Sequence, residues 1–373
     1  MYRVRRRLRS IRPTSFGFLI VVLIVLYWIG FPSLRSVNGV QDKDRYFVRR
    51  TEATFDSRKS PRTVKKQILL VTYGRSGSTF TSALIKQQEG VFFVYEPLYA
   101  LNTSVSRPNN EKGSMAIVKA FLNCDFTAQY AFVLLNRNHI NNSTASKWFR
   151  CMQSSVNDTA MFCFLKMQAE CRSKQVTLIK TIRFQVKWAE SLLAGNPHFK
   201  LLFLVRDPRA TLFSQARVFG NFNKNTQMYT TAQQQCSRLA LDLQDAERLH
   251  KLYPGQVKGI RYEHGATDAL SYAKDIYNFL GLSFDNALVS YIKNITAANL
   301  DNPKVNSTYG VFRHNSTQTM NNWRFKASFN SVQEVDKACA HLYSKLGYQT
   351  VLSQTQLQSQ KSLVLLPDPG GIF

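Results

Sequence analysis

The sequence predicts a three-layer α/β/α domain with a central parallel sheet, preceded by an N-terminal transmembrane helix. Two short apolar runs, at 67–73 and 200–205, each lead into a polar turn and then into a helical pattern. Apolar runs of this length without alternation are typical of strands that helices cover on both faces, as in parallel sheets. The third observation is a charge-free apolar stretch at 16–31, which follows an arginine-rich start.

The N-terminal residues have the pattern of a signal-anchor. Residues 1–15 contain six arginines and no acidic residue, which predicts a cytoplasmic tail. The stretch 16–31 would be about 24 Å long as a helix, which suits a thin internal membrane. A cleaved signal peptide is the alternative, although the apolar run exceeds a usual signal core and no small-x-small site follows it. We predict an uncleaved type II anchor, with the rest of the chain in a lumen or outside the cell.

Three segments are expected after the anchor. Residues 32–66 are polar and lack periodicity, which indicates a stem. A globular domain is expected at 67–350, and the Gln/Ser-rich, then Pro/Gly-rich residues 351–373 are expected to form a flexible tail. Six cysteines without C-x-x-C spacing suit an oxidising compartment, although their pairing is not readable from the sequence. Sequons for N-glycosylation stand at Asn102, Asn141, Asn142, Asn157, Asn294, Asn306 and Asn315.

The composition favours an anionic partner. With 49 Lys and Arg against 23 Asp and Glu, the formal net charge of the 373 residues is +26. Such an excess attracts nucleic acids, acidic membrane surfaces or polyanionic substrates, while part of it belongs to any solvated basic surface. The charge alone does not choose among these partners.

The first predicted strand ends in a loop that suits an anion. The residues that follow the strand are Gly74, Arg75, Ser76, Gly77, Ser78, Thr79 and Phe80. The glycines let the backbone close around an anion, the hydroxyl groups add donors, and the next helix offers free N–H groups at its N-terminus. A nucleotide-triphosphate loop needs four residues between its glycines and a lysine after the second, and this loop has neither. We therefore predict a cradle for phosphate or sulfate, the alternative being a plain Gly/Ser turn.

A second strand, turn and helix offer another anion site. The apolar strand at 200–205 leads directly into Arg206, and Ser214 stands eight residues later in the next predicted helix. Ligands of open parallel sheets bind beyond the carboxyl ends of the strands. Arg206 and Ser214 are therefore expected to clamp a second phosphate, unless they form an ordinary turn and a helix-surface serine.

The remaining elements are predicted from apolar periodicity. Strands are expected at 91–98, 175–183 and 257–262, and a long helix at 231–252. Residues 101–175, with helical segments near 115–122 and 130–135, are interpreted as an insertion exposed on the surface.

Helix caps are predicted in the C-terminal part. Asp268 is expected to cap a helix that stops at Gly281. Ser331 and Glu334 form a capping box for a helix that carries Val335, Cys339, Leu342 and Leu346 and stops before Gly347.

With both loops in view, the sequence resembles the Golgi carbohydrate sulfotransferases that modify the 6-hydroxyl of galactose, N-acetylgalactosamine or N-acetylglucosamine. The resemblance covers about 68–348. The 5′-phosphosulfate loop of that family is matched by 75–80 together with 95–98, Tyr-Glu-Pro-Leu. Its 3′-phosphate motif is matched by 204–210 together with Ser214.

Two positions depart from the pattern of that family. His314 stands where the family usually has an arginine, with Arg313 one place earlier, and His264 stands where an aspartate is preferred. The first departure leaves open whether Arg313 or His314 contacts the 3′-phosphate. The second bears on local packing more than on mechanism.

The resemblance implies a P-loop-like fold and the donor 3′-phosphoadenosine 5′-phosphosulfate (PAPS), without a metal ion. It also implies a glycan hydroxyl as acceptor, no nucleic-acid partner, and a single-pass Golgi membrane protein with a lumenal catalytic domain. The basic composition then favours an anionic glycosaminoglycan, although neutral glycans stay open. A homodimer is also left open.

The same resemblance implies a role for each motif. The loop from Gly74 to Phe80 would hold the 5′-phosphosulfate, and Arg75 would stabilise the leaving phosphate during the transfer. Arg206 and Ser214 would hold the 3′-phosphate. Glu96 is the expected catalytic base, because it follows a strand that ends at the same edge of the sheet. The alternative for Glu96 is a structural carboxylate paired with a nearby arginine.

Two rival functions fit the sequence less well. A nucleotide kinase or triphosphatase would need the phosphate-loop lysine, which is absent. A non-catalytic, membrane-anchored glycan-binding protein could keep the fold, but it would not need both donor motifs together with Glu96.

Overall fold

The computed structural model describes residues 65–101, 108–125, 143–144, 146–153, 157–219, 225–302, 305, 310–359 and 371–373. The predicted cytoplasmic tail, the anchor at 16–31 and nearly all of the stem lie outside these residues and stay predictions. Within the described ranges, no helix combines the length and the apolar character needed to cross a membrane.

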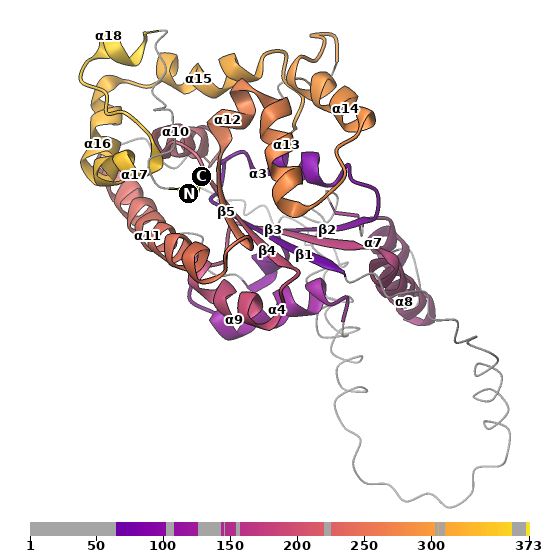
Figure 1. The fold of residues 1–373 in the computed structure, drawn as a ribbon. Helices are drawn as coiled ribbons and strands as arrows, with labels where there is room; N and C mark the ends of the chain where they lie inside the picture. Colours follow the sequence, from indigo (N-terminus) through magenta and orange to yellow (C-terminus); the bar gives the residue numbers. More distant parts are fainter. Residues whose placement is uncertain are drawn as a thin grey trace, which may run out of the picture. The chain divides into compact units, whose positions relative to one another are not determined.

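Five parallel strands form one sheet in the order β2-β3-β1-β4-β5 (Figure 1). The strands are β1 Lys66–Val71, β2 Val91–Tyr95, β3 Val176–Thr181, β4 Phe199–Val205 and β5 Val257–Arg261. In the centre, β1 pairs with β3 through Val71 and Thr181, and with β4 through Val71 and Phe203. The carboxyl ends of these strands therefore meet at one edge of the sheet, as the sequence predicted.

Helices cover both faces of the sheet. The helices of the described residues are α3 Ser78–Ile85, α4 Glu111–Leu122, α7 Ser146–Gln153, α8 Asn157–Ser173, α9 Glu190–Gly195, α10 Pro208–Phe219, α11 Asn225–Leu252, α12 Tyr262–Thr267, α13 Ala269–Leu280, α14 Asn286–Thr296, α15 Ser316–Lys326, α16 Phe329–Cys339, α17 Tyr343–Leu346 and α18 Gln354–Leu357. Short 3-10 helices are η1 Pro97–Leu101, η3 Val186–Ala189 and η4 Ala340–Leu342. Figure 1 shows α3 and α13 on one side of the sheet, and α4 and α9 on the other.

The alternation of side chains along β1 explains the two covered faces. Leu69 and Val71 belong to the core that α4, α11 and α16 complete. Ile68 and Leu70 point the opposite way, into a second core with α3, α13 and α14. The predicted three-layer arrangement around a parallel sheet is therefore confirmed for the described residues.

The interpretation of 101–175 as an exposed insertion is wrong for α4 and for part of α8. Ile117, Val118 and Phe121 of α4 are buried against the sheet. The helix near 115–122 was predicted from its apolar spacing, but the neighbouring sequons and polar loops gave no sign that it packs against the sheet. The predicted helix at 130–135 lies outside the described residues.

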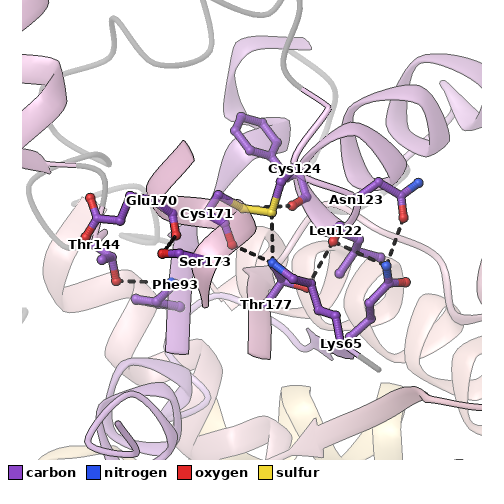
Figure 2. Close-up of a disulfide and its surroundings, with 12 residues drawn as sticks. Lys65, Phe93, Leu122, Asn123, Cys124, Thr144, Glu170, Cys171, Ser173 and Thr177 are labelled. Carbon is purple, nitrogen blue, oxygen red and sulfur yellow. Dashed lines mark hydrogen bonds between the residues drawn. A yellow bond between two sulfur atoms is a disulfide. The ribbon is translucent and has the colours of Figure 1, made fainter. Parts of the chain in front are cut away.

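A disulfide between Cys124 and Cys171 joins the end of α4 to the end of α8 (Figure 2). The ammonium group of Lys65 donates a hydrogen bond to the carbonyl of Cys171 and lies 3.2 Å from the sulfur of Cys124. Burial lowers the pKa of Lys65 to about 8. The start of β1 is thereby tied to the same bridge. The other pairs are Cys151 with Cys163, and Cys236 with Cys339.

The bridge between Cys236 and Cys339 connects α11 to α16 across 103 positions of sequence. Replacing both cysteines by serine is expected to lower the free energy of unfolding by about 2–5 kcal/mol, because the unfolded chain regains the entropy of a long open loop. The Cys151–Cys163 pair, separated by only 12 positions, is the matched comparison. Its removal should cost about 1–2 kcal/mol less. Urea denaturation measures both values, and the opposite order would contradict the loop-length argument.

The predicted flexible tail at 351–373 is wrong for 351–359 and 371–373. Val351 and Leu357 are buried, and the carbonyl of Leu357 accepts a 2.8 Å hydrogen bond from Nε of the buried Arg324. The carbonyl of Ile372 accepts a 2.7 Å bond from the amide of Gly259 on β5. Isolated apolar residues in a polar segment were enough to anchor it, so the domain extends beyond residue 350.

The caps of the C-terminal helices were predicted in part. Asp268 caps α13, and Gly281 ends it, as expected. The predicted capping box at Ser331 is wrong. The N-cap residue is Ser328, whose hydroxyl accepts a hydrogen bond from the amide of Ser331, and α16 begins at Phe329. α16 itself ends at Cys339, but η4 and α17 continue the helical path without a gap to Leu346, and Gly347, with φ of +74°, ends it as expected.

Irregular segments lie along both outer strands of the sheet. On β2, the amide of Tyr95 donates to the hydroxyl of Ser143, and the amide of Thr144 donates to the carbonyl of Phe93. On β5, the amide of Gly259 donates to the carbonyl of Ile372.

Candidate active site

A cavity of about 920 Å³ lies at the carboxyl ends of the strands. It is lined by nearly all residues that the sequence predicted as a site: Gly74, Arg75, Gly77, Ser78, Thr79, Phe80, Glu96, Arg206 and Ser214. Ser76 is the exception. Its side chain is buried, does not line the cavity, and its hydroxyl has no hydrogen-bond partner among the described residues.

The loop after β1 presents the N-terminus of α3 to the cavity. Gly77 is the N-cap residue, with φ of +86° and no side chain to bond the first amides of the helix. The first N–H groups of a helix have no acceptor within it, and they carry the positive end of its dipole. A Cβ atom at Gly77 would lie 2.1 Å from the ring of Tyr262. Glycine is therefore required here both by the backbone and by the space.

Arg75 connects the two predicted anion sites. Its backbone is in the left-handed region, with φ of +68°, a conformation that costs about 1–2 kcal/mol for a residue other than glycine. Its Nε donates to the hydroxyl of Ser214 at 3.1 Å, and its carbonyl accepts from the guanidinium of Arg206 at 2.9 Å. Although Arg75 and Arg206 are 131 positions apart in sequence, their two motifs thus form one continuous surface.

Arg206 is held ready for a ligand. Its guanidinium lies 4.5 Å from the ring centre of Tyr262, and its buried Nε has no hydrogen-bond partner among the described residues. A buried donor without a partner is costly, and an anion in the cavity would satisfy it.

Arg313, which the sequence left undecided, lines the same cavity. Burial lowers its pKa, and the nearby charges of Arg206 and Arg217 lower it further, against the opposing effect of Tyr262. His314 is exposed, does not line the cavity, and its ring nitrogen contacts the carbonyl of Ala298. Three arginines therefore crowd one part of the cavity, an arrangement that favours a bound anion.

Glu96 lines the cavity but is 97% buried and already has partners. Lys180 contacts one carboxylate oxygen at 2.6 Å. The other oxygen accepts the amide of Ile182 at 3.2 Å and the guanidinium of Arg183 at 3.4 Å. The backbone of Glu96 is left-handed, with φ of +50°, which fixes where the carboxylate points. The structural role left open by the sequence is thus present, with Lys180 as the nearer partner.

The cavity is strongly positive. Among its described lining residues, seven are basic and one, Glu96, is acidic. The basic residues are Arg75, Lys180, Arg183, Arg206, Arg217, Arg313 and Lys326. Arg217 and Lys326, on α10 and α15, had no motif in the sequence that singled them out. No three His, Cys, Asp or Glu side chains of the described ranges are grouped so that they could hold a metal ion.

A buried network behind the cavity fixes two of its loops. The carboxylate of Asp242 on α11 accepts the hydroxyl of Tyr73 and the amide of Val186, both at 2.8 Å. Arg238, one turn earlier, pairs with Asp242 and donates to the carbonyls of Ile182 and Phe184. Through these two side chains, α11 fixes the positions of Tyr73, which precedes the loop at 74–80, and of the segment that follows β3.

A profile of the sulfotransferase family matches residues 67–286, more than half of the chain. Carbohydrate sulfotransferase 1 of Danio rerio is 27% identical over 352 residues, covering 82% of this chain and 82% of the relative. Carbohydrate sulfotransferase 3 of Homo sapiens is 24% identical over 350 residues, covering 82% and 72%. The crystal structure of mouse sulfotransferase SULT7A1 complexed with PAP matches this structure with a TM-score of 0.39 and 12% sequence identity. The match covers 74% of this chain and 82% of that chain. The resemblance read from the motifs is confirmed, and the chain belongs to the sulfotransferase family.

Proposed function

We propose that this protein moves the sulfuryl group of PAPS to a hydroxyl group of a carbohydrate. The observation that supports this most directly is the contact between the two anion motifs, Arg75 with Ser214 and Arg206 with the carbonyl of Arg75, in one positive cavity. The names of the curated relatives supply the acceptor class.

The residues of the cavity fit the two anionic groups of this donor. The uncapped start of α3 and Arg75 suit the 5′-phosphosulfate, because both direct positive charge to one point. Arg206, Arg313 and Ser214 suit the 3′-phosphate, since Arg206 has a buried donor without a partner and Arg313 is desolvated. The bound donor supplies the activated sulfur to which the acceptor oxygen forms its bond.

The proposed transfer needs charge stabilisation and a proton acceptor. As the acceptor oxygen bonds to sulfur, the bond from sulfur to the 5′-phosphate oxygen breaks, and its electron pair stays on that oxygen. Arg75 and the N–H groups at Ser78 and Thr79 stabilise the growing negative charge. Glu96 takes the proton of the acceptor hydroxyl. Lys180 and Arg183 hold the carboxylate in place for that step.

Replacing Glu96 by glutamine tests the proposed base. Glutamine keeps the shape of the side chain but cannot take the proton, so kcat should fall by about 100-fold or more. The affinity for the donor should stay within about threefold of the unchanged protein, since Glu96 does not contact the anion loops. The melting temperature should also fall, because Lys180 loses its buried counter-charge. A variant that loses melting temperature but keeps a third or more of its kcat would assign Glu96 a structural role alone.

The proposed function is tested with residues 60–373 made in a secretory host, so that the packed residues beyond 350 are included. Donor binding is measured by calorimetry with the desulfated donor, and transfer is measured with radiolabelled PAPS. Acceptors are chondroitin, keratan sulfate, heparan and an oligosaccharide ending in N-acetylglucosamine. Transfer to any of them supports the proposal. Donor binding without any transfer would support a non-catalytic glycan-binding protein, and a folded domain that binds no donor would overturn the proposal.

The proposal extends to location, with the chain anchored in the Golgi membrane and the catalytic domain in the lumen. Three disulfides include all six cysteines of the chain, which suits an oxidising compartment. The arginine-rich start before the apolar stretch at 16–31 favours an orientation in which the N-terminus is cytoplasmic and the catalytic domain is lumenal. Imaging the full-length chain beside a Golgi marker, with a protease-protection assay, tests this part.

A further inference from the structure

The positive charge of the cavity exceeds what the donor needs. Seven basic side chains and one acidic side chain line the described cavity. PAPS carries about four negative charges at neutral pH, about two on the 3′-phosphate and about two on the phosphosulfate. The negative charge of Glu96 neutralises that of Lys180, which it contacts at 2.6 Å. Six positively charged side chains then remain for about four negative charges of the donor. At least one cation of the cavity is therefore available to another anionic group.

The order of the strands indicates which cation this is. Arg206 follows β4 and Arg75 follows β1, so the proposed donor lies over these two strands. Arg183 follows β3, on the other side of β1, about 10 Å from the end of β4. The proposed 3′-phosphate site lies toward β4, so the part of the cavity toward β3 and β2 is left for the acceptor. Arg183 lies on that side.

The surroundings of Arg183 suit an acceptor subsite. Its guanidinium lies 4.9 Å from the ring centre of Tyr99, which is 40% exposed and follows β2. Its contact with Glu96, at 3.4 Å, is long, since Lys180 is the nearer partner of that carboxylate. The carbonyls of Ile182 and Phe184, on either side, are held by Arg238, so the backbone of Arg183 is fixed. A planar, pre-positioned guanidinium over an aromatic ring favours a carboxylate or a sulfate ester.

We propose that Arg183, supported by Tyr99, binds a negatively charged group of the acceptor glycan close to the hydroxyl that is modified. This inference rests on the proposed sulfuryl transfer to carbohydrate and deepens it. The preferred acceptor is then an acidic glycan, with either a uronate carboxylate or a sulfate ester as the recognised group. Neutral glycans of the same backbone are poorer substrates.

Matched pairs of acceptors test this proposal. For the carboxylate, chondroitin is compared with its methyl ester, which removes the charge without adding a hydroxyl. For the sulfate, a keratan oligosaccharide with one sulfate ester is compared with its desulfated form. In the wild-type protein, kcat/KM should be at least about tenfold higher for the charged member of one pair. The pair that shows the difference identifies the recognised group.

We define the charge preference as the ratio of kcat/KM for the charged acceptor to kcat/KM for its uncharged counterpart. The variant Arg183→Gln should reduce this ratio to about threefold or less, while KM for PAPS stays unchanged. Arg183→Lys keeps the charge but not the planar fork, so it should give an intermediate ratio. Lys187→Gln is the matched control, because it removes one exposed positive charge from the same segment without touching the cavity. It should leave the ratio unchanged. The ratio is the readout because Arg183 also contacts Glu96, so total activity could change through that contact.

Equal kcat/KM for both members of both pairs in the wild-type protein would overturn the subsite while leaving the proposed function intact. A loss in Arg183→Gln that is the same for charged and uncharged acceptors would also overturn it, and would limit Arg183 to orienting Glu96. Absence of transfer to all four members of these two acceptor pairs would count against a carbohydrate acceptor, and the subsite would be rejected with it.

Discussion

Replacing Arg75 by alanine is expected to reduce kcat by about 100- to 1,000-fold, the usual effect of removing one preorganised donor from a developing negative charge. The guanidinium is placed by its hydrogen bond to Ser214 and by the fixed backbone that Arg206 contacts. KM for PAPS should change much less than kcat, because Arg206 and Arg313 remain. Steady-state rates with radiolabelled PAPS, together with calorimetry of the desulfated donor, separate the two effects.

Arg75→Gly provides the matched comparison. It removes the same side chain but relieves the left-handed backbone, which has φ of +68°. We expect it to be as inactive as the alanine variant while its free energy of unfolding is about 1 kcal/mol higher. If the glycine variant regained activity, backbone conformation and not the guanidinium would be the property that matters. Arg75→Lys should recover only part of the rate, since it keeps the charge without the planar donors.

Replacing Gly77 by alanine is expected to abolish measurable transfer, with kcat/KM lower by about 1,000-fold or more. The added methyl group would lie 2.1 Å from the ring of Tyr262, and the backbone, at φ of +86°, is one that alanine rarely adopts. Relief requires movement of the loop or of Tyr262, and Tyr262 also stacks with Arg206. Both donor sites are therefore disturbed by one methyl group. Donor affinity and kcat/KM are the measurements.

Gly255→Ala separates the two causes of this effect. Gly255 has a similar backbone, with φ of +75°, but a Cβ atom there would meet no heavy atom within 4 Å. This variant should lose about 1 kcal/mol of stability and keep full activity. If Gly77→Ala lost no more stability and activity than Gly255→Ala, the contact with Tyr262 would be easily relieved, contrary to our expectation.

The sequence predicted the parts of the site that depend on local chemistry. The loop at Gly74–Thr79 and the Arg206–Ser214 unit were recognisable because glycines, hydroxyls and an arginine followed apolar strands. Parallel strands bring such ends together, so the common cavity followed from the topology. The contact between Arg75 and Ser214 did not follow from it, since it depends on how α10 is placed over the loop.

Other features depend on packing that one sequence does not display. Arg217 and Lys326 line the cavity from α10 and α15, whose crossing is set by distant contacts. The nearer partner of Glu96, Lys180, lies 84 positions away on the neighbouring strand. The pairing of the cysteines and the packing of the C-terminal residues are likewise long-range. Local periodicity predicts an element, but not the neighbour against which it is buried.

The covered outer strands of the sheet limit how two copies of the domain could associate. An exposed strand edge offers a row of unpaired amides and carbonyls to another chain. Here part of that row on β2 is bonded to Ser143 and Thr144, and on β5 to Ile372. Sheet continuation between two copies would first have to displace these residues. A homodimer of this domain, which the sequence left open, would therefore use helical or loop surfaces, and its strands would remain intramolecular.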